Sequence, residues 1–355
     1  MIENEKNKGS IQMQRQRISK RQKVNKNKSV SINPLVLGVD LGGSKILSAV
    51  VNVKGEILSR DRSTTPAAKG PEAVIQAMLE SAKRVLNQAG ITTAELEAIC
   101  IGAPGLSNPK TGVVFTSPHL PRWTDVPLRN IIEKKMDVKT LLLNDTNAAA
   151  LGELYFGAAK GARNFICVTL GTGIGGGIVI DGEIYAGSLG TAGEIGHMTI
   201  DTNGPKCNCG NTGCWETLAS GTALAREAKQ RISDGAKTSI LEYADGDVNK
   251  VNAETVHKAA QQGDTLAKEL IAQLAYYIGV GLANLIHIFN PELIVIGGGL
   301  SNIGDMLLEP AYKLAGERVN KTAFASVRFA RAELGRNSGV IGAAAYAFRE
   351  IGKLK

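Results

Sequence analysis

Asn144 and Asp145 directly follow the short apolar run 141–143 and precede a segment of helical composition, 146–156. A carboxylate at the end of a strand can accept the proton of a hydroxyl group, as phosphoryl transfer requires. The same position also suits an ordinary helix N-cap, for which Asp is a preferred residue. By itself the pair leaves a general base and a capping residue both open.

A glycine-rich turn directly follows the apolar run 35–39. Its candidate phosphate contacts are Gly42, Gly43, Ser44 and Lys45, with Asp40 as a candidate ligand of Mg²⁺ through water. Glycines let backbone N–H groups approach phosphate oxygens without interference from a Cβ. Taken alone, two glycines after a strand more often form a hairpin turn, and the spacing fits neither a Walker A loop nor a Rossmann fingerprint.

A second segment, 171–177, has five glycines in seven residues. So much glycine costs backbone entropy and gives a strand little to pack. A group that approaches the backbone closely would explain it, and a polyphosphate fits. Gly171, Thr172 and Gly173 are the candidate contacts, and Gly298 and Gly299 form a third turn suited to the adenosine. Together the turns predict one nucleotide cleft.

Cys207, Cys209 and Cys214 lie within eight residues of each other and follow His197. One imidazole and three thiolates make a complete tetrahedral zinc site, which is structural because no position remains for water. The spacing is typical of metal binding rather than of a disulfide framework. We therefore expect a zinc knuckle.

The zinc knuckle would also hold a set of polar side chains in a fixed geometry. Glu194, His197 and Glu216 offer acceptors and a donor suited to neighbouring sugar hydroxyls. Discrimination among polyols requires hydrogen-bonding groups that are placed in advance. The pattern predicts a sugar-binding loop.

The elements that would position these residues alternate between strands and helices, and the chain is long enough for two lobes around a cleft. The first three strands read as an antiparallel meander. The predicted strands are 35–39, 46–53, 56–63, 97–103, 141–143, 165–170, 177–180 and 293–296. The predicted helices are 71–89, 146–156, 217–232, 264–289 and about 338–351.

The net charge of +8 is concentrated in residues 1–33, which carry +7. This tail has few large apolar residues and reads as disordered. An inert tail, a start at Met13, a targeting role and anion binding all stay open. The nearly neutral remainder argues against a nucleic-acid surface, and the apolar stretch 276–289 is too short to span a bilayer. We expect a cytoplasmic protein with no membrane or nucleic-acid partner.

Six segments in order resemble the ROK family of repressors and sugar kinases, and its kinase members most of all. These are VDLGGSK, LNDTNAAALGE, LGTGIGGG, GTAGEIGH, CNCGNTGCWE and NPELIVIGGG, within about 35–345. The resemblance implies an α/β, two-lobed actin-like or hexokinase-type (ribonuclease H-like) fold with a central cleft. It divides the chain into a small lobe, 34–144 plus about 338–355, and a large lobe, 145–337.

The resemblance also implies roles for the site residues. Asp145 would be the catalytic base of an ATP-dependent hexose kinase. The sugar would contact Asn144, Glu194, His197 and Glu216, with Gly102 and Ala103 bordering its pocket. The segments 40–45 and 171–173 would bind the phosphates of ATP, with Mg²⁺, and the four knuckle residues would hold zinc. A homodimer or higher homo-oligomer is expected.

Alternatives within the family concern substrate and role. Glucose, phosphorylated on its 6-hydroxyl, is the first expectation; N-acetylmannosamine, N-acetylglucosamine, fructose, mannose and allose are the alternatives. A sugar-responsive repressor is the main rival from another class, yet the first 33 residues lack the apolar core of a winged helix-turn-helix. A catalytically inactive sugar sensor is disfavoured because Asp145 and both glycine turns are present.

Overall fold

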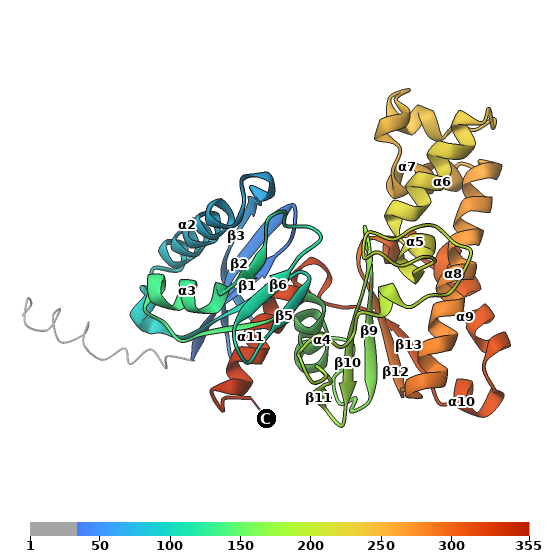
Figure 1. The fold of residues 1–355 in the computed structure, drawn as a ribbon. Coiled ribbons are helices and arrows are strands. Elements are labelled where there is room, and N and C mark those ends of the chain that lie inside the picture. The colour runs from blue at the N-terminus through green and yellow to red at the C-terminus, as the bar shows by residue number, and fades with distance from the viewer. Residues whose placement is uncertain (1–33, 355) are drawn as a thin grey trace, which may run out of the picture.

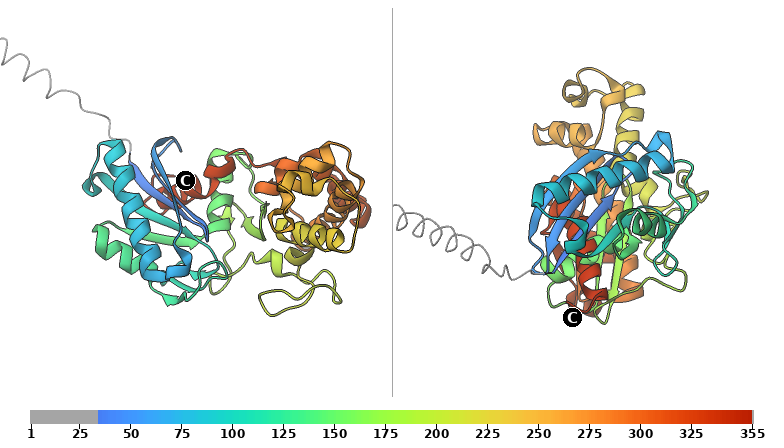
Figure 2. Two further views of the ribbon diagram at one scale, coloured as in Figure 1. Left: turned by 90° about the horizontal axis from the view of Figure 1, so that it is seen from above. Right: turned by 90° about the vertical axis from the view of Figure 1, so that its left-hand side faces the viewer.

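The structure, a computed structural model, describes residues 34–354, so the predicted tail lies outside the described residues. The chain forms two lobes, each built on a five-stranded sheet (Figure 1). Seen from above, the blue and cyan segments lie at one end and the yellow and orange helices at the other (Figure 2). The green and red segments lie between them.

The first sheet has the strand order β3-β2-β1-β4-β8. The strands β1, β2 and β3 pair antiparallel, as predicted, while β4 is parallel to β1 and β8 is parallel to β4. Both faces of β1 are covered, which explains its nearly continuous apolar sequence. The bounds are β1 (Leu35–Leu41), β2 (Lys45–Asn52), β3 (Ile57–Thr64), β4 (Leu96–Ala103) and β8 (Thr140–Asn144).

Helices α2 (Pro71–Ala89) and α3 (Leu128–Met136) cover one face of this sheet. The bounds of α2 match the prediction: Pro71 is its first residue and Gly90, with φ +69°, ends it in the left-handed conformation. A three-stranded sheet is inserted between β4 and β8. It consists of β5 (Leu106–Asn108), β6 (Val113–Thr116) and β7 (Thr124–Val126).

The second sheet has the order β11-β10-β9-β12-β13. Its strands are β9 (Phe165–Leu170), β10 (Ile174–Ile180), β11 (Glu183–Ile184), β12 (Leu293–Gly297) and β13 (Arg328–Arg331). Most of the remaining helices share one hydrophobic core with this sheet, and α6 and α7 extend beyond it (Figure 1). They are α5 (Trp215–Ala219), α6 (Gly221–Ser233), α7 (Ala253–Gln261), α8 (Thr265–Phe289), α9 (Asp305–Arg318) and α10 (Lys321–Ala325).

Two helices, α4 (Asp145–Phe156) and α11 (Ser338–Glu350), lie between the sheets (Figure 1). Ala148 and Leu151 of α4 join the core that α11 forms on the first sheet, whereas Ala150 joins the core against the second sheet. A Cβ on Gly342 of α11 would collide with the carbonyl oxygen of Ala148. The missing side chain therefore lets the two helices cross closely.

Short 3₁₀ helices complete the chain path. They are η1 (Ala67–Lys69), η2 (Thr93–Glu95), η3 (Ile195–His197), η4 (Ile240–Ala244), η5 (Val248–Lys250), η6 (Gly299–Ile303) and η7 (Gly335–Asn337).

Two sequence-based assignments need correction. The predicted helix 217–232 is two helices, because Ser220 has an extended backbone (φ −100°, ψ 169°) and its side chain caps α6 by accepting from the N–H of Ala223. Strand β10 begins at Ile174 rather than at the predicted residue 177, so Gly175 and Gly176 also lie within it. A Cβ on Gly177 would come within 2.5 Å of Ala150 and one on Gly175 would collide with Thr146, so these two glycines let α4 approach the sheet.

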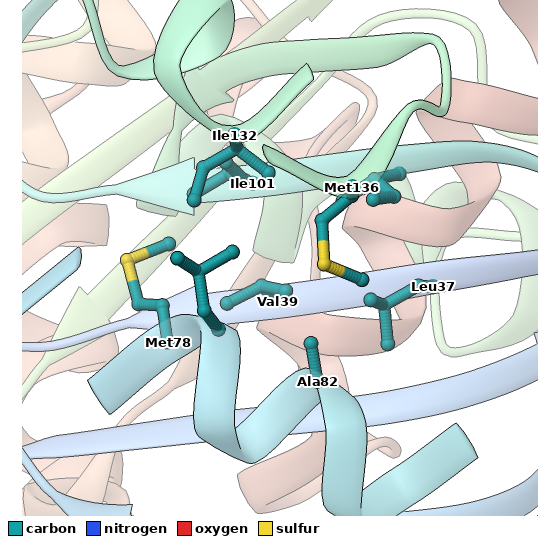
Figure 3. A pocket seen from close by; sticks show the side chains of 9 residues that line it. Leu37, Val39, Met78, Ala82, Ile101, Ile132 and Met136 are labelled. Carbon is teal, nitrogen blue, oxygen red and sulfur yellow. The ribbon is translucent and has the colours of Figure 1, made fainter. Parts of the chain in front are cut away.

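The core of the first lobe encloses a small apolar cavity of about 10 Å³ (Figure 3). Its walls include Leu37 and Val39 of β1, Met78 of α2 and Met136 of α3. This volume is at the lower limit for one water molecule, and the walls offer it no polar partner. The cavity is a packing gap between flexible methionines and is no ligand site.

Helix α8 is long and apolar enough, by length and composition alone, to cross a bilayer, and it extends beyond the stretch 276–289 considered in the sequence. Its buried residues belong to the core of the second lobe. That burial accounts for its apolar composition.

Candidate functional site

The carboxyl ends of three neighbouring strands bring the first group of predicted residues together. In the ladder Asp40 pairs with Gly102, and Ala103 pairs with Asn144. Parallel strands end at the same edge of a sheet, where open α/β sheets bind ligands. The structure therefore places residues from three distant segments at one edge.

Asn144, and not Asp145, is the N-cap of α4. Its Oδ1 accepts from the backbone N–H groups of Thr146, at 2.9 Å, and Asn147, at 3.2 Å, and its Nδ2 donates to the carbonyl of Gly105. Asp145 is the first residue of the helix, and its Oδ1 also accepts from the N–H of Thr146. The capping explanation of Asp145 is thereby removed, and its carboxylate needs another explanation.

Asp145 and Asp40 are neighbouring carboxylates in this site. Burial, and then the charge of Asp40, raises the pKa of Asp145 to about 7, with a smaller contribution from Glu194. Burial raises the pKa of Asp40 to about 6. Within residues 34–354, the ion pairs include neither carboxylate. Two acidic groups without a basic partner suit a cation or a proton transfer.

The turn after β1 is closed by its own backbone and held from outside. Gly42 donates to the carbonyl of Lys45, the Thr65 hydroxyl donates to the carbonyl of Gly42 at 2.7 Å, and the Thr65 N–H donates to the carbonyl of Ser44. The side chains of Ser44 and Lys45 are exposed. The loop thus has a fixed backbone and free polar side chains.

The second glycine turn is held by the start of α6. Gly221 donates its N–H to the carbonyl of Gly171 at 2.8 Å, and the hydroxyl of Thr222 donates to the carbonyl of Thr172 at 2.7 Å. A Cβ on Gly221 would come within 2.9 Å of the same Gly171 oxygen. The helix N-terminus therefore lies against the turn, where its dipole favours an anion.

The third glycine turn adjoins the second. Strand β12 pairs with β9, so that Gly297 is opposite Thr169. Gly298 has a φ of +86°, and a Cβ there would come within 2.8 Å of the Leu170 nitrogen, whereas Gly299 faces open space. The turns 171–173 and 298–299 thus lie side by side at one edge of the second sheet.

The four knuckle residues form one cluster, with one ligand atom from each residue and all of these atoms within 4.8 Å of one another. The sulfurs of Cys209 and Cys214 are 3.7 Å apart, and Cys207 Sγ is 3.6 Å from Nδ1 of His197. Tetrahedral zinc, with Zn–S of about 2.3 Å and Zn–N of about 2.0 Å, gives S···S edges of about 3.8 Å and S···N edges of about 3.5 Å. The donor set and its spacing fit zinc.

His197 presents its two ring nitrogens to different partners. Nδ1 faces the thiol cluster, whereas Nε2 is 3.9 Å from Oε2 of Glu194. Burial raises the pKa of Glu194, and the nearby His197 opposes that shift. One imidazole therefore links the metal cluster to the acidic part of the site.

Glu216 connects the knuckle to the second glycine turn. Its Oε2 accepts from the N–H of Ile174 at 2.8 Å, and a Cβ on Gly173 would collide with this carboxylate. Glu216 was predicted only as a sugar ligand. The structure shows that one of its oxygens also holds the glycine turn.

Sequence reasoning missed several residues that shape the site. Thr65 and Thr222 hold the two glycine turns, and a Cβ on Gly339 of α11 would come within 2.7 Å of the Asp40 carboxylate. Single threonines give no recognisable pattern, and the apparent continuity of 217–232 concealed the helix start at Gly221, directly before Thr222. Gly339 resembles any small residue of a buried helix face.

A family model described as the ROK family matches residues 36–350. The chain belongs to the ROK family. The predicted family and the predicted two-lobed α/β fold are both confirmed.

Relatives in this ROK family include kinases and regulators. A glucokinase of Streptomyces coelicolor is 38% identical over 315 residues, which cover 87% of this chain and 96% of that protein. The structure of a ROK family glucokinase from Streptomyces griseus in complex with glucose and AMPPNP matches with a TM-score of 0.80 at 36% identity, covering 89% of this chain and 99% of that one. A xylose repressor of Caldicellulosiruptor bescii is 30% identical, covering 89% of this chain and 78% of that protein.

Proposed function

We propose that this ROK protein is an ATP-dependent hexose kinase that phosphorylates the 6-hydroxyl of glucose, with Asp145 as the general base. The observation that carries the proposal is the state of Asp145: a carboxylate that does not cap its helix, has a pKa raised to about 7, and lies at the strand ends beside Asp40. A general base works best when its pKa lies near the working pH.

The proposed step is an in-line phosphoryl transfer. The O6 hydroxyl of the sugar donates its proton to Asp145 while O6 attacks the γ-phosphorus of ATP. The bond from this phosphorus to the bridging oxygen breaks, and ADP leaves with the electron pair. Asp145 then releases the proton to solvent, and the products are the sugar 6-phosphate, ADP and H⁺.

The glycine turns are the proposed nucleotide site. Gly42, Gly43, Ser44 and Lys45 would bind phosphate from the first lobe, and Gly171, Thr172 and Gly173 from the second. Gly298 and Gly299 lie beside the second turn and would border the adenosine. Asp40 is the residue that would hold Mg²⁺ through water, and the cation would neutralise charge that develops on the phosphates.

The knuckle and the strand ends are the proposed sugar site. Glu194, His197 through Nε2 and Glu216 through Oε1 would bind hydroxyls, together with Asn144. Gly102 and Ala103 would form the floor, since a Cβ on Gly102 would come within 3.5 Å of the Asp145 Cα. Zinc, held by His197, Cys207, Cys209 and Cys214, would fix the geometry of the knuckle. Its four protein ligands exclude a bound water, so its role would be structural.

Glucose is the proposed substrate because glucokinases are among the relatives and one of them is the glucose complex from Streptomyces griseus. A sugar-sensing regulator is the second candidate, since xylose repressors are also relatives. We further propose a cytoplasmic homodimer or higher homo-oligomer. The lobe division at residues 144/145 and about 338 stays a prediction.

The deciding experiment is ADP release measured with ATP, Mg²⁺ and a panel of hexoses and N-acetylhexosamines. We expect glucose to give the highest kcat/KM. Release that is fastest with another sugar would change the substrate and keep the kinase. No release with any sugar, together with measurable sugar binding, would favour the regulator.

A further inference from the structure

A cavity of about 210 Å³ lies beside α4, between both lobes. The turn between β5 and β6, the segment 183–190, and the facing sides of α4 and α11 form its walls. Its volume is far above the 10–15 Å³ or so that one water molecule needs. The cavity can hold a small molecule, and none of the residues assigned above to sugar, nucleotide or zinc lines it.

The cavity lies on the opposite side of α4 from Asp145. Asn147 lines the cavity and follows Asp145 by two residues. Because successive helical residues are about 100° apart, the two side chains point about 200° apart around the helix axis. The cavity is therefore separated from the catalytic carboxylate by the helix itself.

Asn147 is the polar feature of this cavity. The residue is 2% exposed, and in the part of the chain that the structure describes its Oδ1 has no hydrogen-bond partner. A buried acceptor left unpaired costs about 1–3 kcal/mol. The oxygen is itself buried, so a ligand hydroxyl can donate to it only when the Asn147 side chain turns toward the cavity, and such a bond would remove the cost.

The remaining walls indicate the chemistry of that ligand. Leu143, Leu151 and Ile184 are apolar, as are the faces of sugar rings that pack on such surfaces. The charged lining residues balance: Lys110 and Arg349 against Glu183 and Glu350, with Arg349 paired to Glu183. A wall without net charge favours an uncharged ligand over a phosphorylated one.

We propose that this cavity is a second ligand site, which binds an uncharged polyhydroxylated molecule of monosaccharide size with a hydroxyl donated to Asn147. The segment 183–190 continues directly to Glu194, and a Cβ on Gly190 would come within 2.5 Å of Pro109 in the β5–β6 turn. A bound molecule therefore contacts both lobes.

The test is calorimetric titration of the full chain with D-glucose in the absence of ATP. The choice of glucose as probe rests on the proposed function. We expect two binding events per chain. Ser188→Trp, at an exposed position on the cavity rim, should fill the cavity and weaken one event at least tenfold, and Asn147→Leu should weaken the same event. Ser188→Ala is the matched control, since it leaves the cavity open and should keep both events.

Glucose 6-phosphate serves as the charged probe. We expect it not to bind in this cavity, so Ser188→Trp should remove none of its binding events. The proposed second site would be wrong if the unmodified chain gave a single binding event and neither Ser188→Trp nor Asn147→Leu altered it. Failure of the proposed function has a different signature, because ADP release would then be absent while the event sensitive to Ser188→Trp persists. Thermal unfolding of each variant confirms that a lost event is not a lost fold.

Discussion

At the residue scale, the pair Asn144–Asp145 divides two tasks that the sequence alone could not separate. Asn144 satisfies the first N–H groups of α4, as N-caps do. Asp145 can therefore keep a carboxylate directed to chemistry. The helix dipole also favours an acidic residue at the first helical position, which offsets part of the cost of burying this carboxylate.

Asp145→Asn should reduce kcat by about 10²–10⁴-fold, which is the usual contribution of a general base. The KM for glucose should change by less than about threefold, because the amide keeps the shape and polarity of the carboxyl. Steady-state kinetics with ADP detection measure both constants. Asp137→Asn, at an exposed position with φ +55° that Asn tolerates, is the matched control. A variant at position 145 with full turnover would refute the base assignment.

The pKa of Asp145 predicts the pH profile. Because the pKa is raised to about 7, the carboxyl is protonated below that pH and cannot accept a proton. The value of kcat/KM should rise about tenfold per pH unit below 7 and level off above it. A profile of kcat/KM from pH 5.5 to 8.5 tests this. The control is Asp145→Asn, whose residual activity should not show the rise below pH 7.

The raised pKa of Asp145 also affects protein stability, but in the opposite direction. Activity should increase with pH, whereas the free energy of unfolding should decrease. The folded-state pKa of Asp145 lies above its unfolded value of about 3.9, so ionisation is harder in the folded chain. This group should therefore lower the free energy of unfolding as pH rises from about 4 through 7. The thermal midpoints of the unmodified chain and of Asp145→Asn should agree near pH 4, and their difference should grow up to pH 8. A difference that shrinks over this range would contradict the raised pKa of Asp145.

At the element scale, regular segments were predictable from sequence and their interruptions were not. The strand 165–170 and the helix 71–89 were predicted with the observed bounds, since apolar patterning and flanking Gly and Pro define them. The break at Ser220 was missed because apolar residues on both sides, Ala219 before it and Ala223 and Leu224 after it, keep a helical period. The glycines of β10 were assigned to phosphate, although the approach of α4 accounts for Gly175 and Gly177 and that of Ile195 for Gly176.

The site was predictable to a similar extent. Residues proposed to carry chemistry, such as Asp145 and the Cys₃His set, stand out by type and spacing. Residues that hold them do not, because Thr65, Thr222 and Gly339 act through contacts with segments far away in the sequence. Such contacts exist only once the chain has folded.

Cys209→Ser tests the knuckle as an element. We expect one zinc per unmodified chain by elemental analysis, and loss of that zinc in the variant. His197 and Glu216 should then lose their fixed positions, and the KM for glucose should rise roughly fivefold for each hydrogen bond of about 1 kcal/mol that is lost. Cys167→Ala, in β9 away from the cluster, should retain zinc. An active, metal-free chain would refute the knuckle.

At the scale of the whole molecule, the chain crosses between the lobes twice, after α4 and before α11. Glu153, which is fully buried, joins both crossings. Its Oε2 accepts from the N–H groups of Ala158, at 2.9 Å, and Glu333, at 3.1 Å, and its Oε1 accepts from Leu334 at 3.0 Å. One carboxylate therefore holds the two connections about which any movement of the lobes would occur.

Glu153→Gln should loosen this junction while leaving the proposed catalytic residues unaltered. The amide places an NH₂ group against N–H donors, so at least one buried donor loses its acceptor, at a cost of about 1–3 kcal/mol. The midpoint of urea unfolding should fall accordingly, whereas Glu97→Gln, at an exposed position of β4, should leave it unchanged. Proteolysis should then begin between 157 and 164 or between 332 and 337, because the weakened segments open first. An unchanged midpoint would show that the lobes are held together without Glu153, and would leave the crossing of α4 and α11 at Gly342 as the principal connection.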